Sequence, residues 1–241
     1  MARLMLYTPR TIALICELFH PPIQPDATPI QRVHNQLYQS GDPLYSSFSV
    51  TPAGAVLSNP VSQPGANSFV AFLADRFQFR EELSGLTYDD FAGRVRSLSQ
   101  HVSRERGLHV FTGQQVTVRT LVNPRAFKDS RAYLKNGMFG FDDETDVFGR
   151  EPQLYGIRMV FPATPEHPGS HLIRIESFHN DPRSLFIENT SSYGPILVES
   201  GNESGLEQVE ANILASYRFV TDPTMRFIGG FDTNGAAPEE P

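Results

Sequence analysis

The stretch Thr11-Ile12-Ala13-Leu14-Ile15-Cys16-Glu17-Leu18-Phe19 carries apolar side chains at both odd and even positions. Successive side chains of a strand point to opposite faces of a sheet, so this pattern is typical of a strand covered on both faces or placed in the middle of a sheet. Pro21-Pro22 ends the stretch, because proline cannot donate to a strand ladder. The sequence therefore predicts a central strand over residues 11–19.

The first half of the chain predicts the order strand, helix, two strands, helix, strand. Its clearest signal is a helix that begins at a Thr87 cap and buries Phe91, Val95, Leu98 and Val102, which are spaced four, three and four residues apart. This order matches the ferredoxin-like βαββαβ fold, in which two helices cover one face of an antiparallel sheet. The other expected elements are a helix over 29–39, strands over 44–51 and 55–58, a strand pair within 68–80, and strands over 108–111 and 115–122.

The second half predicts a helix, three or four antiparallel strands and a closing helix. The closing helix begins at the capping box Ser204-Gly205-Leu206-Glu207 and buries one apolar face. The remaining elements are a helix over 126–136, strands over 155–161, 171–178, 184–189 and 196–199, and a last short strand over 226–228. We therefore expect an α+β protein of two packed halves, 1–124 (ferredoxin-like) and 125–230, whose antiparallel sheets are covered by helices, with a disordered tail over 231–241.

Composition and charge exclude several functions. The 241 residues carry a net charge of −7, and the excess is local: residues 1–124 hold 10 Lys+Arg against 9 Asp+Glu, and residues 125–241 hold 10 against 18. No basic stripe exists, so nucleic acid is not expected as a partner. The longest apolar runs, 12–16 and 69–74, fall short of the roughly 18 residues of a membrane span, so no membrane partner is expected. With a single cysteine and no apolar N-terminal segment of signal length, the sequence predicts a cytoplasmic protein.

Metal and nucleophile motifs are weak. The seven histidines form no helical His-x-x-x-His pair, and an EF-hand loop counted from Asp142 would place Val147 and Gln153 where glycine and glutamate are required. Cys16 lies in the middle of the first strand beside Glu17, which favours a buried structural cysteine over a nucleophile. We expect no metal and no cofactor.

The densest polar cluster surrounds a predicted hairpin. Arg174 and Glu176 share one sheet face, because alternate strand residues point the same way, and His179 and Asp181 lie in the turn. One interpretation is an acid/base group of Glu176, His179 and Asp181 at a sheet rim, as in a small hydrolase-like enzyme. The other is a solvent-facing ion pair followed by a turn that uses Asn and Asp for conformational reasons.

Several short stretches follow one another in an order typical of a known family. They are Phe72-Leu73-Ala74-Asp75-Arg76-Phe77, Tyr88-Asp89-Asp90-Phe91, Val118-Arg119-Thr120-Leu121-Val122-Asn123, Leu206-Glu207-Gln208-Val209 and Tyr217-Arg218-Phe219-Val220-Thr221. With them the chain resembles, over residues 12–230, a sporadically distributed family of uncharacterised bacterial proteins of about this length. The family is more aromatic at the strand that here ends in Arg119 and Asn123. The resemblance implies no known reaction, and it implies an association with mobile or defence-type gene neighbourhoods.

Three functions remain open. The leading hypothesis is a non-catalytic protein-binding or assembly module, possessing a protein partner or associating with itself, because catalytic signatures are missing and phenylalanine is abundant. Any phenylalanine that lies exposed would mark the partner surface. The second hypothesis is the Glu176/His179/Asp181 enzyme, and the third is an anion or small-ligand site between the halves that uses Arg119, Asn123 and Arg174.

Overall fold

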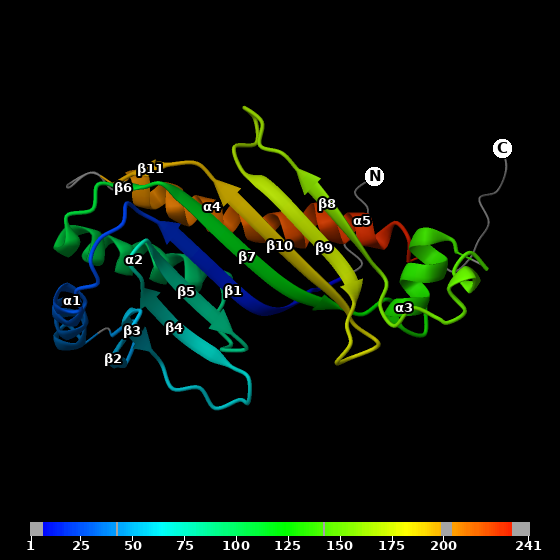
Figure 1. The fold of residues 1–241 in the computed structure, drawn as a ribbon, viewed down its shortest axis with the longest axis horizontal. Coiled ribbons are helices and arrows are strands. Elements are labelled where there is room, and N and C mark those ends of the chain that lie inside the picture. The colour runs from blue at the N-terminus through cyan, green and yellow to red at the C-terminus, as the bar shows by residue number, and fades with distance from the viewer. Residues whose placement is uncertain (1–6, 42, 142, 199–203, 233–241) are drawn as a thin grey trace.

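The computed structural model of this chain describes residues 7–41, 43–141, 143–198 and 204–232. Its main feature is one antiparallel sheet with the strand order β2-β3-β4-β5-β1-β7-β10-β9-β8 (Figure 1). The strands of this sheet are β1 (Arg10–Phe19), β2 (Ser47–Thr51), β3 (Gly54–Ser58), β4 (Asn67–Phe72), β5 (Arg76–Glu82), β7 (Gly113–Val122), β8 (Gly156–Phe161), β9 (Ser170–Ser177) and β10 (Leu185–Tyr193). The short strands β6 (Val110–Phe111) and β11 (Ile196–Leu197) pair with each other outside it.

The predicted central strand is confirmed. β1 lies in the middle of the sheet, hydrogen-bonded to β5 on one side and to β7 on the other. Leu14, Cys16 and Leu18 are buried on one face, and the residues between them, such as Ile15 and Glu17, are half-buried on the other. The mixed apolar pattern therefore comes from the central position of the strand rather than from cover on both faces.

Helices cover one face of the sheet, and α2 and α4 lie behind it in Figure 1. The predicted apolar face of α2 is fully buried, Thr87 caps its start, and Gly107 ends it in the left-handed conformation at φ 62°. α4 begins at Ser204 and buries Leu206, Val209 and Ile213 of its predicted apolar face, whereas Tyr217 of that face is half-buried. The helices are α1 (Thr28–Gln39), α2 (Tyr88–Arg106), α3 (Ser130–Ala132), α4 (Ser204–Phe219) and α5 (Met225–Gly229), with π-helical segments over Tyr133–Phe139 and Val220–Thr224 and a 3-10 turn over Asp146–Phe148.

The strands of both halves form a single sheet. β7 from the first half pairs along its length with β10 from the second, with Arg119 opposite Glu188. This pairing removes an exposed strand edge from each half, and exposed edges favour unwanted association. The chain is thus an α+β protein with a large antiparallel sheet. A ferredoxin-like first half is not confirmed, because β1 and β5 are antiparallel, whereas the split βαβ arrangement brings two parallel strands together.

Several parts of the second half differ from expectation. The strand predicted over 184–189 continues to Tyr193 as β10, and β11, expected as a fourth strand beside the others, pairs with β6 outside the main sheet. Residues 226–228, predicted as a strand, lie in α5, because the helical chain passes Pro223 through a π-helical turn and continues. The helix predicted over 126–136 begins later, where the Asp129 side chain accepts from the Ala132 backbone N–H at 2.7 Å. Of the predicted tail, Phe231 and Asp232 are described and residues 233–241 lie outside the described part.

Candidate functional site

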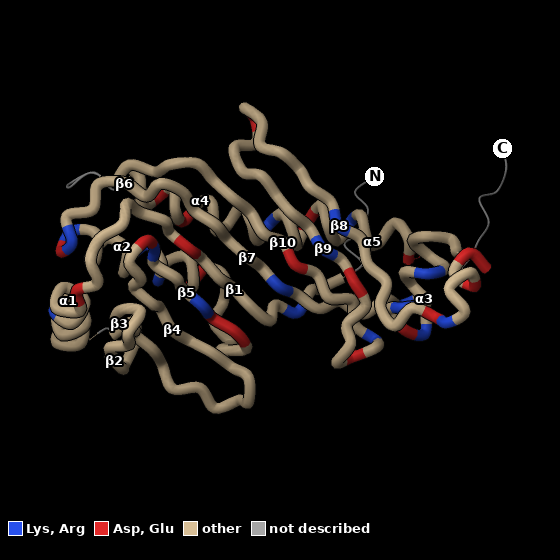
Figure 2. The backbone as a smooth tube through the Cα atoms, in the orientation of Figure 1, with Lys and Arg blue, Asp and Glu red and all other residues tan. Residues whose placement is uncertain are grey.

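No helix of the described residues covers the second face of the sheet, and Figure 2 shows charged residues of both signs along its middle strands. Strand register creates a charge row, which consists of Glu82, Arg119, Glu188 and Arg174. Glu188 is opposite Arg119 on one neighbour and opposite Arg174 on the other. Glu82 and Arg119 both lie opposite Ala13, whose small side chain lets them meet across β1.

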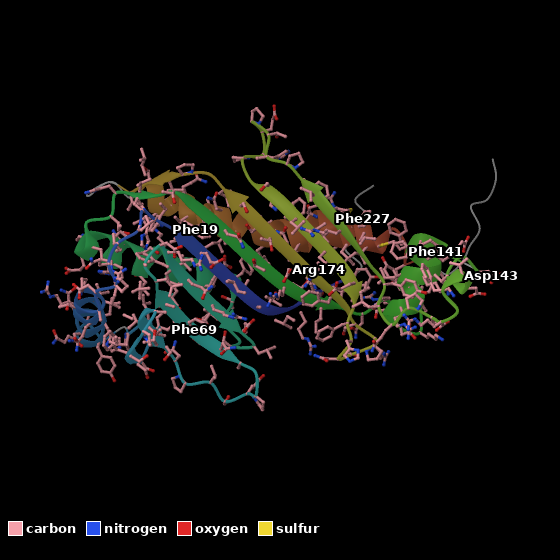
Figure 3. The ribbon with its side chains drawn as sticks, viewed as in Figure 1. Phe19, Phe69, Phe141, Asp143, Arg174 and Phe227 are labelled. Atoms are coloured by element: carbon pink, nitrogen blue, oxygen red, sulfur yellow. The ribbon has the colours of Figure 1, made fainter. Side chains whose placement is uncertain are left out.

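Both arginines of the charge row are neutralised by carboxylates. Arg119 Nε lies 2.6 Å from Glu188 Oε2, and Arg119 Nη1 lies 3.3 Å from Glu82 Oε1. Arg174, labelled in Figure 3, pairs with Glu188 at 3.3 Å and with Glu176 at 3.7 Å, and its guanidinium lies over the Phe186 ring. Cross-strand pairs of this kind stabilise a sheet and fix its register. Because carboxylates already neutralise both guanidinium groups, Arg119 and Arg174 have little positive charge left to attract an anionic ligand.

The three candidate acid/base residues have separate partners. Glu176 faces Arg174, the His179 ring lies 3.3 Å from the Gln153 amide, and Asp181 accepts from the Ser184 hydroxyl at 2.6 Å and from the Arg183 backbone N–H at 3.2 Å. Among the described residues, no hydrogen bond or ion pair joins Glu176, His179 and Asp181 to one another. Asp181 instead belongs to a cavity at the end of the sheet.

This cavity, of about 640 Å³, lies where the first residues of β1, the last residues of β7 and the turn before β10 come together. We call it the arginine cavity, after Arg10, Arg125 and Arg183. Of the residues predicted to bind a ligand, Asn123 lines it, whereas Arg119 and Arg174 lie in the charge row. Its lining is Tyr7, Thr8, Arg10, Leu121, Val122, Asn123, Pro124, Arg125, Phe127, Asp181, Arg183 and Ser184.

The three arginines are exposed, and none of their guanidinium groups forms an ion pair within the described ranges. Asp181 is the one carboxylate in the cavity lining, and Ser184 and the Arg183 backbone already occupy its oxygens. The cavity therefore carries an excess of positive charge in a protein whose net charge is −7. Guanidinium groups bind carboxylates and phosphates in bidentate geometry, so this lining suits an anion.

A sequence signal marks these arginines, and it was missed. Each one directly follows a proline, in Thr8-Pro9-Arg10, Asn123-Pro124-Arg125 and Asp181-Pro182-Arg183, and the sequence contains no other Pro-Arg dipeptide. Proline lacks an N–H and is found at strand ends, so each tripeptide lies beside an end of a strand. Only the antiparallel order of β1, β7 and β10 brings the three ends together.

One wall of the cavity is held by the end of the described chain. The Asp232 carboxylate accepts from the Tyr7 hydroxyl and, at 2.8 Å each, from the backbone N–H groups of Arg125 and Ala126. Burial, and then the hydrogen bond and negative charge of Asp232, raise the pKa of Tyr7, so this phenol stays protonated and donates. The Arg125 guanidinium lies over the Tyr7 ring, which orients it at the cavity.

A buried serine–histidine contact has no sequence signature. Ser191 Oγ lies 2.9 Å from His171 Nδ1, a spacing that nucleophile and base share in some enzymes. Ser191 is fully buried, however, and Phe219 stacks on the His171 ring at 3.9 Å. Burial lowers the pKa of His171, which keeps the imidazole neutral. This pair packs α4 against the sheet.

Comparisons of the chain with protein-family models, with curated proteins and with solved structures found no match. Among the described residues, no cluster of three or more His, Cys, Asp or Glu side chains has the geometry of a metal site. The helices in the same residues include none with the length and apolarity of a membrane span.

Proposed function

We propose that this protein is a binding protein whose arginine cavity holds a ligand through an anionic group, a phosphoryl or a carboxylate. The observation that carries the proposal is the convergence of all three Pro-Arg dipeptides, from residues 10, 125 and 183, on one cavity without carboxylate partners. A volume of about 640 Å³ is in the range of small-molecule sites. The cavity lies where both halves of the chain contribute strand ends, which agrees with the expected ligand site between the halves.

Pyrophosphate is a suitable probe, because it offers several oxygens to more than one guanidinium. We expect isothermal titration calorimetry to detect its binding to the full chain, and the unfolding temperature to rise in pyrophosphate beyond the rise in sodium chloride of equal ionic strength. Arg10→Ala and Arg183→Ala should each weaken binding by about tenfold, the value of one charge-assisted contact.

Arg104→Ala is the matched control, since Arg104 is an exposed arginine in the last turn of α2 and does not line the arginine cavity. It removes the same charge and should leave pyrophosphate affinity unchanged. Equal losses in Arg104→Ala and in the cavity variants would show nonspecific charge attraction and would contradict the proposal.

The edge strand β8 favours a second candidate, self-association of this chain by strand pairing. β8 has one neighbour in the sheet, β9, and exposes Val160 by 67% and Phe161 by 41%. A two-fold antiparallel pairing of β8 with β8 centred on Met159 places Ile157 opposite Phe161 and Arg158 opposite Val160. This register places the apolar Ile157 and Phe161 opposite each other and keeps the two Arg158 side chains apart, which favours strand pairing.

Analytical ultracentrifugation tests this second candidate. We expect a concentration-dependent dimer that Val160→Lys weakens, because a lysine on an edge strand opposes pairing. Val50→Lys, on the opposite edge strand β2, is the control and should leave the dimer intact. A strict monomer at concentrations of about 100 μM would contradict self-association, since weak assemblies have micromolar dissociation constants.

A further inference from the structure

A second cavity, of about 280 Å³, lies on the helix-covered side of β5 and is lined by a buried ion pair. We call it the glutamate cavity, after Glu81, which is 3% exposed at the end of β5. Arg94 of α2 also lines it and places Nη1 at 2.7 Å from Glu81 Oε1. Its apolar lining comes from Pro60, Val61, Ala66, Leu83 and Leu86.

Three donors converge on a single oxygen of this carboxylate. Glu81 Oε1 accepts from Arg94, from the Ser68 hydroxyl at 3.0 Å and from the Tyr45 hydroxyl at 3.4 Å. Ser68 in turn accepts from the Asn59 amide at 3.3 Å. Glu81 Oε2 has no hydrogen-bond partner within the described part of the chain. Because Oε2 is not sealed from solvent, it can accept a hydrogen bond from a ligand in the cavity.

Arg94 makes a single hydrogen bond to Glu81. A carboxylate and a guanidinium usually form two parallel hydrogen bonds, but this pair makes one, and the Arg94 guanidinium lies over the Tyr45 ring at 5.0 Å. The Arg94 side chain is 18% exposed and lines the cavity, so its guanidinium can also donate to a ligand there. Because the two charges cancel each other, the cavity suits a neutral group rather than an ion.

The backbone next to the cavity is strained. Leu83 has φ 49°, and it is the one non-glycine residue with positive φ in the described ranges. Its N–H donates to Ile12 O at 3.0 Å, which ties the segment after β5 to the bulge in β1. Bulky side chains rarely adopt this conformation, and such outliers cluster at ligand sites.

From these observations we propose that the glutamate cavity binds a neutral carboxamide-type group, which donates an N–H to Glu81 Oε2 and accepts from Arg94 through its carbonyl. The apolar lining would hold the carbon skeleton that bears the amide. This site is separate from the arginine cavity, and the inference does not rest on the proposed function.

Three ligands of the same shape test this arrangement of one acceptor and one donor. Benzamide carries an acceptor and a donor side by side, benzoate carries acceptors, and benzamidine carries donors. In amide-resolved NMR titrations of the full chain, we expect benzamide to shift the Ser84 and Gly85 signals at concentrations at least about tenfold lower than the other two, since each mismatched ligand leaves one group unpaired. Shifts at Leu121 and Asn123 would report the arginine cavity instead. Benzamide binding no tighter than benzoate at Ser84 and Gly85 would overturn the proposal.

Glu81→Gln replaces the acceptor Oε2 with the glutamine amide nitrogen, which is a hydrogen-bond donor. We expect benzamide to weaken by about tenfold and benzoate to bind in its place. Glu82→Gln is the control, since Glu82 is the next residue on the opposite sheet face and should leave both affinities unchanged. If Glu81→Gln does not fold, Arg94→Lys removes the planar donor pair and should weaken benzamide equally. Unchanged benzamide affinity in a folded variant overturns the proposal.

Discussion

At the residue scale, Glu82 of the charge row makes the stability of the protein depend on pH. Burial alone would raise the pKa of this carboxyl, but hydrogen bonds from Arg80 and Asn67, and the charges of Arg80 and Arg119, outweigh burial and hold the pKa below its usual value of 4.5. The unfolded chain then binds more protons than the folded chain below about pH 5. The stability that Glu82 supplies is complete above its unfolded pKa and is lost as the pH falls through its folded pKa.

Glu82→Gln tests this linkage. We expect the variant to lose about 1–2 kcal/mol of unfolding free energy at pH 7, and the difference from the parent to shrink as the pH falls from 5 to 3. Urea unfolding at a series of pH values measures both effects. Glu151→Gln, which removes the same charge from an exposed loop pair, is the control. Parallel stability curves for parent and Glu82→Gln would contradict the prediction.

Cys16 gives a second prediction at this scale. The side chain is fully buried, and burial raises the pKa of its thiol to about 12. Because thiolates rather than thiols react, we expect no labelling by a disulfide reagent at pH 8 in the native protein and full labelling in denaturant. Native labelling at the rate of a free thiol would show that β1 opens.

At the scale of elements, two helix glycines have opposite roles. A Cβ at Gly205, in the first turn of α4, would lie 1.8 Å from Leu197 O, so the helix start would have to move from β11. A Cβ at Gly93, inside α2, would meet nothing within 4 Å.

Alanine at these two positions should shift stability in opposite directions. We expect Gly205→Ala to lower the unfolding free energy by about 1–3 kcal/mol through overpacking, and Gly93→Ala to raise it by about 0.5–1 kcal/mol through helix propensity. Chemical denaturation measures both. Equal effects of the two substitutions would mean that α4 does not approach β11 so closely.

At the scale of the whole molecule, Asp232 joins segments far apart in the chain. It binds Tyr7 before β1 and the backbone of Arg125 after β7, so it holds one wall of the arginine cavity. Asp232→Ala should cost about 1–3 kcal/mol of unfolding free energy and weaken pyrophosphate binding, because Arg125 loses its fixed position. Asp222→Ala, which removes an exposed pair with Arg226, is the control in the same measurements. Unchanged pyrophosphate affinity in Asp232→Ala would show that this carboxylate does not position Arg125 for binding.

The sequence by itself determined the elements whose signals are local. The buried face of α2 follows from a spacing of 3.6 residues, and its start follows from the Thr87 cap. The central place of β1 follows from apolar residues at both odd and even positions. The secondary structure of residues 226–228 could not be predicted in this way. A short apolar run fits strand or helix equally, and the π-helical turn at Pro223 depends on the packing of α4 and α5.

Only the tertiary structure decided the pairing of the strands and therefore the sites. Register placed Arg119 between Glu82 and Glu188, which neutralised a residue that looked free in the sequence. The order of β1, β7 and β10 collected three Pro-Arg dipeptides at one end of the sheet, although about 60 residues or more separate them along the chain. Local sequence specifies backbone conformation, whereas contacts between distant segments depend on the packing of the whole chain, and the candidate sites consist of such contacts.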